Sequence, residues 1–201
     1  MKDQLPTAEA YLVQADPLLG ELIKTQTITL SEPRTDYFAS LARSIIGQQV
    51  SVAAARTIAG RFEAHTNYSP VKTVQLDEDT IRAIGLSRQK ARYIHDLAHH
   101  FVDNPAVYNH LDALSDDEVI TDLTAVRGIG TWTAQMFLMF TLERPDIFAP
   151  DDAGLQRAMM QLYKWDVLPP KKDLITTANT WQPYRTIACL HLWHSLDNTP
   201  D

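Results

Sequence analysis

Two short segments of the chain combine residue types that suit phosphate binding and acid–base chemistry. Residues 126–134 contain Gly128 and Gly130, and the carboxylates Asp151 and Asp152 follow further along the chain. Two nearby glycines permit a tight turn and the close approach of another backbone. A helix that begins directly after such a turn presents unpaired N–H groups to an anion. The combination predicts a protein that grips a nucleic-acid backbone and performs carboxylate-dependent chemistry nearby.

The elements on either side of the glycines have clear helical patterns. Ser115 and Glu118 have the spacing of a capping box, in which each side chain pairs with a backbone N–H of the other residue. Apolar residues then recur at helical spacing up to the glycines, and residues 131–142 form a second, strongly apolar helical segment. We therefore expect a helix–hairpin–helix motif over about residues 116–142. A simple helix connection that binds nothing is the alternative for two glycines alone.

The rest of the chain also has helical periodicity, which predicts an all-α fold. Ser51 and Ser87 are placed to cap helices, and Asp151 or Asp152 begins another. Strand signals are weak, and residues 26–30 are the best candidate. One of the two aspartates is expected to act as an N-cap, and Asp151 is the one that we assign to this structural role.

Composition limits the class of protein. The 201 residues suffice for one domain, or for two small helical lobes of one unit. No secretory signal or membrane-spanning run is visible, and the lone Cys189 is expected to be a buried, inert thiol, so we expect a cytoplasmic protein. The net charge of −7 argues against nucleic-acid binding. However, residues 41–62 and 81–92 contain basic residues and no acidic ones, which predicts a basic face on an acidic body.

Four segments, in order, resemble the helix–hairpin–helix (HhH-GPD) DNA glycosylase superfamily, and in particular its bacterial 3-methyladenine DNA glycosylase II branch. They are residues 42–53, 85–94, 123–157 and 184–193. The resemblance implies an all-α fold with two small helical lobes flanking a cleft, and a single glycosylase domain over residues 1–201. The extra N-terminal mixed domain of longer relatives is expected to be absent.

The activity implied by the resemblance is excision of alkylated purines, of the 3-methyladenine and 7-methylguanine type, from damaged double-stranded DNA. Relatives that also cut the strand carry a lysine where this chain has Trp132, so we expect hydrolysis without AP-lyase chemistry. One cysteine cannot ligate an iron–sulfur cluster, and no cofactor is expected to be required. We further expect a monomer that does not associate with membranes.

The same resemblance assigns roles to individual residues. Asp152 matches the catalytic carboxylate, while Trp132 and Trp193 match aromatic positions of the base pocket. Met136 stands in the pocket where some relatives have tyrosine, which puts the substrate range in doubt. For either tryptophan, burial in the core is the alternative reading.

Further positions are implied to contact DNA. Gln49 matches the residue that wedges into the duplex, and Gln48 is its rival. The carbonyl oxygens of Thr124, Val126 and Ile129 match those that hold a monovalent cation in relatives. The residues expected at the DNA backbone are Gly128, Gly130, Thr131, Arg88 and Lys90.

Three other functions remain open at this point. They are a glycosylase for neutral lesions such as uracil or hypoxanthine, a non-catalytic helix–hairpin–helix DNA-binding module, and a metal-dependent nuclease using Asp151 and Asp152. Two histidine pairs have spacings that place them on one helix face, but they lack the partner ligands of a zinc site. These pairs are His95 with His99 and His191 with His194.

Overall fold

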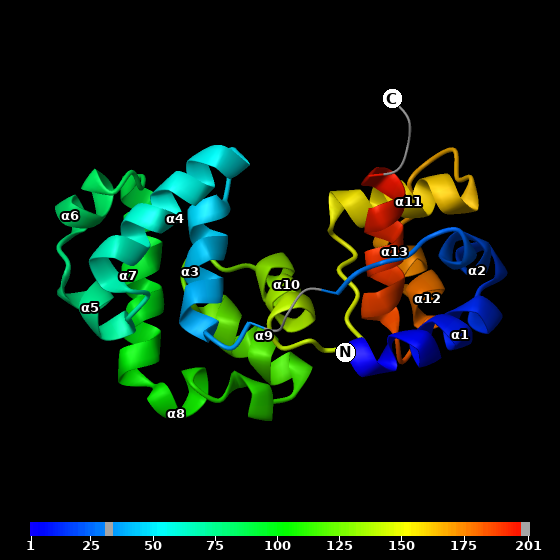
Figure 1. Cartoon of the computed structure of the whole chain (residues 1–201), viewed down its shortest axis with the longest axis horizontal. Coiled ribbons are helices and arrows are strands. Elements are labelled where there is room, and N and C mark those ends of the chain that lie inside the picture. Colours follow the sequence, from blue (N-terminus) through cyan, green and yellow to red (C-terminus); the bar gives the residue numbers. More distant parts are fainter. Residues whose placement is uncertain (31–33, 198–201) are drawn as a thin grey trace. The chain divides into compact units, whose positions relative to one another are not determined.

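The computed structural model describes residues 1–30 and 34–197, and within them every regular element is a helix (Figure 1). This confirms the all-α prediction. Residues 26–30, the strand candidate, form no strand. A strand must pair its backbone with a neighbouring strand, and the described part of the chain offers none. The strand prediction for this segment was therefore wrong.

The chain forms two compact units. Unit 1 comprises Met1–Pro33 and Leu138–Asp201, and unit 2 comprises Arg34–Phe137. Unit 1 is thus built from both ends of the chain, and unit 2 is one continuous stretch between them. The division falls inside a helix, α10 (Thr131–Phe140), whose last residues are counted with unit 1.

Unit 2 consists of helices whose ends are fixed by local side-chain caps. The hydroxyls of Ser51, Ser87 and Ser115 accept hydrogen bonds from backbone N–H groups three residues further on, and the capping box at Ser115 is complete. These caps confirm three predicted helix starts. The elements are α3 (Tyr37–Gly47), α4 (Val52–Thr66), α5 (Pro70–Gln75), α6 (Glu78–Ala83), α7 (Arg88–Asp103), α8 (Pro105–Tyr108), η2 (Leu111–Ala113), α9 (Asp116–Ala125) and the first part of α10.

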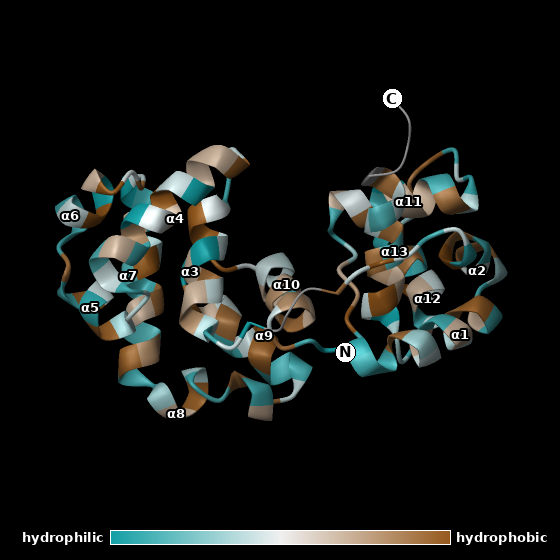
Figure 2. Cartoon of the chain, viewed as in Figure 1, coloured by the Kyte–Doolittle hydropathy of each residue, from teal (hydrophilic) through white to brown (hydrophobic). Residues whose placement is uncertain are grey.

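Helix α7 is central to unit 2, since it contacts α3, α5, α6 and α8. Its fully buried Ile94 and Leu97 lie in the apolar core together with Ile45 of α3. Hydrophobic and hydrophilic residues alternate around these helices, as amphipathic packing requires (Figure 2). Burial of the apolar side chains holds α3 and α7 together, and both helices border the loop between α3 and α4.

Unit 1 brings the N-terminal helices against the C-terminal ones. Its elements are η1 (Lys2–Gln4), α1 (Leu5–Ala15), α2 (Pro17–Lys24), α11 (Ala153–Tyr163), α12 (Lys171–Asn179) and α13 (Arg185–Asp197). Helix α13 contacts α1, α2 and α11. None of the helices in the described ranges has the length and apolar character needed to span a bilayer.

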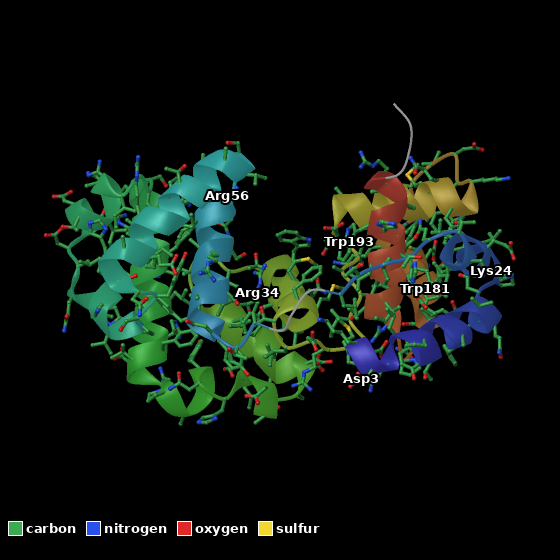
Figure 3. The ribbon with its side chains drawn as sticks, in the orientation of Figure 1. Asp3, Lys24, Arg34, Arg56, Trp181 and Trp193 are labelled. Carbon is green, nitrogen blue, oxygen red and sulfur yellow. The ribbon has the colours of Figure 1, made fainter. Side chains whose placement is uncertain are left out.

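A buried carboxylate joins the two halves of unit 1. Asp16 caps α2 by accepting bonds from the N–H groups of Leu18 and Leu19, each at 3.1 Å. Its Oδ2 also accepts from the indole N–H of Trp181 at 3.0 Å and from the hydroxyl of Tyr163. Trp181 is fully buried and lies among the helices of this unit, so it is a core tryptophan (Figure 3).

The inner face of α13 is fully buried. Cys189 lies there, which confirms the expected burial, and this burial raises the pKa of its thiol. His191 is also fully buried, and its Nε2 and Nδ1 lie 3.1 Å from Glu9 and 3.3 Å from Gln26. The N-terminal segment therefore holds α13 through polar as well as apolar contacts.

Candidate nucleic-acid interface and active site

The predicted hairpin is a tight turn between α9 and α10. The N–H of Ile129 donates to the carbonyl of Val126 at 3.1 Å, and Gly128 at the third position has φ of +86°. A positive φ at that position is what a type II turn requires, and glycine adopts it without strain. Helix α10 begins directly afterwards, at Thr131. The turn therefore lies next to the first N–H groups of α10, as expected for an anion-binding helix start.

The turn is pressed against α7, which explains the glycine at position 128. A Cβ at this position would lie 2.2 Å from Cδ2 of Tyr93, well inside van der Waals contact. Gly130 is different, because a Cβ there would meet no atom within 4 Å. Asp96, one turn beyond Tyr93, accepts a 2.8 Å bond from the N–H of Arg127. Position 128 therefore needs glycine for internal packing, and position 130 leaves open space outside the turn.

The two candidate wedge residues have different surroundings. The amide nitrogen of Gln48 donates to the carbonyl of Gly128 at 2.9 Å, so this side chain is engaged with the hairpin. Gln49 is exposed and has a left-handed backbone with φ of +55°. The geometry favours Gln49 as the side chain that is available to enter a duplex.

Lys90 is hydrogen-bonded within the protein. Its Nζ donates to the carbonyl of Ile46 at 2.8 Å and to the carbonyl of Gln48, both at the C-terminal end of α3. The ammonium group is thus engaged by two backbone carbonyls, a contact that the predicted role at a DNA phosphate does not include. The sequence around Lys90 could not reveal these bonds, because their acceptors are backbone oxygens more than forty residues earlier in the chain.

Three other basic residues of unit 2 lie near acidic side chains. Arg88 and Arg92 lie 3.7 and 3.6 Å from the carboxylate of Glu78, and Arg82 lies 3.2 Å from Asp79. All three arginine side chains are substantially exposed, so these pairs contribute little to stability and can exchange for a phosphate. Arg56 of α4 is exposed as well (Figure 3).

The capping role falls to the other of the two adjacent aspartates than expected. Asp152, not Asp151, is the N-cap of α11, because its Oδ1 accepts a 2.8 Å bond from the N–H of Leu155. The same Oδ1 accepts a 2.9 Å bond from the indole N–H of Trp193. Asp151 is exposed and pairs with Lys171 at 2.5 Å. The assignment of Asp151 as the cap was therefore wrong, since the cap must directly precede the helix and α11 begins at Ala153.

Trp193 contacts both Asp152 and the ring of Phe140 in unit 1. It projects from α13 near the start of α11, where its indole nitrogen meets Asp152 (Figure 3). Its ring lies beside that of Phe140, with the centroids 5.8 Å apart and an interplanar angle of 33°. A hollow of about 360 Å³ next to this ring is lined by Trp193, Phe140, Leu190, His194 and residues 28–30. Trp193 is partly exposed and is therefore not a core tryptophan.

The remaining pocket candidates, Trp132 and Met136, lie on α10 in unit 2. The side chain of Trp132 is 44% exposed, and Met136 one turn later is partly exposed. An indole that is nearly half exposed is unusual for a packing residue and suits a surface on which a base can stack. The structure thus groups Trp132 and Met136 in one unit, and Asp152 and Trp193 in the other.

Gly154 provides a test of the geometry around Asp152. A Cβ at this position would lie 3.0 Å from Oδ1 of Asp152 and 3.2 Å from Nε1 of Trp193. Gly154→Ala should change the stability of α11 little, because the gain of about 1 kcal/mol for alanine over glycine in a helix opposes the strain on the cap bond of Asp152. On the catalytic role that the resemblance assigns to Asp152, the displaced carboxylate should slow single-turnover base release by about tenfold. Equal rates for both proteins, at equal thermal stability, would show that the position of Asp152 does not limit the reaction.

Sequence reasoning missed several contacts that shape these sites. Nothing in the local pattern pointed to Phe140 beside Trp193 or to Tyr93 beneath Gly128. Both contacts join residues that are far apart in sequence and have no periodic relation to each other. The amide of Gln48 was considered only as a wedge, because its partner is a backbone carbonyl that any residue supplies.

Comparisons with known proteins identify the family of the chain. A profile of the HhH-GPD superfamily of base excision DNA repair proteins matches residues 42–183. A Bacillus subtilis protein whose name assigns it to the DNA-3-methyladenine glycosylases is 31% identical over 166 residues. That match covers 78% of this chain and 58% of the relative, so the chain spans little more than half of that protein.

Two solved structures extend the similarity to the fold. The DNA-3-methyladenine glycosidase of Bacillus halodurans is 34% identical, with a TM-score of 0.83 over 93% of this chain and 88% of that one. The 3-methyladenine DNA glycosylase of Schizosaccharomyces pombe, solved with abasic DNA, is 26% identical, with a TM-score of 0.78. The match covers 95% of this chain and 97% of that one.

Proposed function

We propose that this chain, which belongs to the HhH-GPD superfamily of base excision DNA repair proteins, removes alkylated purines from double-stranded DNA. The N-glycosidic bond is hydrolysed and an abasic site remains. The names of the relatives and of the structural neighbours support this substrate class. The observation that carries the proposal is the carboxylate of Asp152, which the Leu155 N–H and the Trp193 indole hold at the start of α11.

In the reaction, the bond between C1′ of the sugar and the nitrogen of the base breaks, and both electrons leave with the base. Positive charge develops on the sugar, and the fixed carboxylate of Asp152 stabilises it electrostatically. A water molecule then forms the new bond to C1′ and loses a proton, which Asp152 can accept. A purine alkylated at N3 or N7 is cationic and departs neutral, so a separate general acid is not required.

Recognition of the base requires that the nucleotide leaves the stack. Trp132 and Trp193 supply electron-rich indole faces, which favour a cationic base over a neutral one by about 0.5–2 kcal/mol per contact. Met136 provides a softer wall than an aromatic ring and can adapt to bases of different shape. These three residues are proposed as the base-binding side chains, and cationic purines as the preferred substrates.

The duplex is proposed to be held by the hairpin, with Gln49 filling the gap left by the flipped nucleotide. Gly128, Gly130 and Thr131 present backbone to a phosphate, and Arg88 adds positive charge. The carbonyls of Thr124, Val126 and Ile129 are proposed to hold a monovalent cation. Thr124 lies in the last turn of α9, where carbonyls lack intrahelical donors, and Val126 accepts only one turn bond in the described hairpin. Such a cation would offset the charge of the bound phosphate.

Strand cleavage is not part of the proposed activity. The position that supplies the Schiff-base lysine in bifunctional relatives holds Trp132, and an indole cannot attack C1′. The expected product is therefore an intact strand with an abasic site, which breaks only on treatment with alkali.

The proposal is tested by incubating the protein with methylated duplex DNA in EDTA and measuring the free bases. Release of 3-methyladenine or 7-methylguanine with intact strands is the expected result. Release of uracil or hypoxanthine alone, from duplexes that carry them, would replace the proposal with a neutral-lesion glycosylase. Duplex binding without release of any base would indicate a non-catalytic module, and strand cleavage that EDTA abolishes would indicate a metal-dependent nuclease.

A further inference from the structure

The short loop between α3 and α4 carries Gln49, and it is anchored from below by Lys90. The Nζ of Lys90 donates to the carbonyls of Ile46 and Gln48, which flank the end of α3. Carbonyls at a helix C-terminus lack intrahelical donors and carry partial negative charge, so an ammonium group is a fitting partner. Partial burial of the side chain lowers the pKa of Lys90, as expected for a charge drawn away from water into the protein.

The same loop is also tied to the hairpin. The Gln48 side chain donates to the carbonyl of Gly128 at 2.9 Å, and Gly128 lies against Tyr93. Tyr93 follows Lys90 by about one turn on α7. One stretch of α7 therefore supports the wedge loop on one side and the hairpin on the other, and Gln48 connects the two directly.

The backbone of Gln49 shows why such support is needed. Its φ of +55° places a residue other than glycine in the left-handed region, which costs roughly 1–2 kcal/mol. Conformations of this kind persist only where the surrounding structure imposes them, and they often occur at functional sites. The bonds from Lys90 to the carbonyl preceding Gln49 and from Gln48 to the hairpin are the constraints present here.

We infer that Lys90 is a positioning residue that sets the distance between the duplex wedge and the phosphate-binding hairpin, instead of binding DNA itself. The inference rests on the proposed function, because it needs Gln49 to enter a duplex that the hairpin holds. Entry of Gln49 beside a flipped nucleotide is productive only if the hairpin grips the phosphate at a fixed spacing from the wedge. Lys90 fixes this spacing through its two hydrogen bonds to backbone carbonyls, and neither bond involves DNA.

The test compares Lys90→Met with Arg88→Met, which removes the same charge from the same helix. A lysine or arginine that contacts a phosphate contributes about one unit to the slope of log affinity against log salt concentration. We therefore expect Arg88→Met to reduce this slope by about one. Lys90→Met should leave the slope unchanged. Lys72→Met, at an exposed residue of α5, controls for loss of overall charge.

A second readout reports the wedge itself. A duplex with 2-aminopurine beside the alkylated nucleotide gains fluorescence when the neighbouring stack opens. Lys90→Met should reduce this signal and slow single-turnover base release by about tenfold at saturating protein. Lys90→Arg, which keeps a cation with several donors, should restore part of both. Combined with Gln49→Ala, Lys90→Met should have little additional effect.

The outcomes separate the inference from the proposed function. Wild-type protein that releases no methylated base overturns the proposed function, whatever the variants do. With an active wild type, a salt slope that falls by about one unit in Lys90→Met, with unchanged release at saturation, would overturn the inference and restore Lys90 as a phosphate ligand. If Lys90→Met does not fold, Gln48→Met removes only the bond to Gly128 and should show the same loss of unstacking. An unchanged unstacking signal in Gln48→Met would equally overturn the inference.

Discussion

Asp152→Asn is expected to retain duplex binding and to lower the single-turnover rate of base release by about 10²–10³-fold. Asparagine keeps a side-chain oxygen that can accept from the Leu155 N–H and from the Trp193 indole, and it is as good an N-cap as aspartate. The substitution therefore removes the negative charge and leaves the helix start intact. Affinity for DNA should stay the same or rise slightly, because one repulsive charge is lost. The measurement is base release from methylated duplex at saturating protein, together with thermal unfolding.

The matched control for this prediction is Asp151→Asn. Asp151 is exposed and pairs with Lys171 on the surface, so its charge should not affect bond cleavage. Full activity in Asp152→Asn, at normal stability, would mean that the carboxylate does not take part in catalysis. A loss in Asp151→Asn that equals the loss in Asp152→Asn would point instead to a pair of acidic groups, as in the nuclease alternative.

Gly128→Ala should destabilise unit 2, whereas Gly130→Ala should weaken DNA binding alone. Alanine at position 128 would have to adopt φ of +86° and would bring its Cβ to 2.2 Å from the Tyr93 ring. The left-handed conformation and the overpacking together cost about 2–5 kcal/mol in unfolding free energy. At position 130 a Cβ meets no protein atom within 4 Å, so stability should not change. That open space is where a phosphate would approach, and a methyl group there should reduce affinity.

Thermal unfolding and duplex binding of the two glycine variants are measured in parallel. Gly128→Ala with Tyr93→Ala tests the physical cause, since removing the ring should recover most of the packing cost but not the cost of φ. Equal stability of Gly128→Ala and wild type would contradict the close contact with Tyr93. Unchanged affinity in Gly130→Ala would mean that DNA does not approach this side of the turn.

Local features of the sequence predicted much of the fold. The caps at Ser51, Ser87 and Ser115 depend on residues within one helical turn, and each was found where its pattern placed it. The helix–hairpin–helix motif combines such a cap with glycines whose conformational freedom is intrinsic. Residues 26–30 failed as a strand because strand formation depends on a partner elsewhere in the chain, which a local pattern cannot reveal.

The surroundings of the site residues were less predictable. Asp151 and Asp152 have the same chemistry and adjacent positions, so only the exact start of α11 decides which one becomes the cap. Lys90 was expected at the DNA backbone because its neighbours in sequence include no acidic residue, yet its partners are carbonyls of α3. Contacts of side chains with distant backbone atoms leave no trace in residue types.

The division of unit 1 between the two ends of the chain has a consequence during synthesis. Unit 2 is continuous and can fold as soon as residues 34–137 have left the ribosome. The apolar faces of α1 and α2, with Leu12 and Leu19, gain their C-terminal partners only when α11 and then α13 emerge. A nascent chain stalled before α13 would already present the hairpin, but the Trp193 indole that holds Asp152 would be missing. On the proposed function, such a chain would bind DNA before it could hydrolyse a glycosidic bond, so the synthesis of α13 would set the onset of activity.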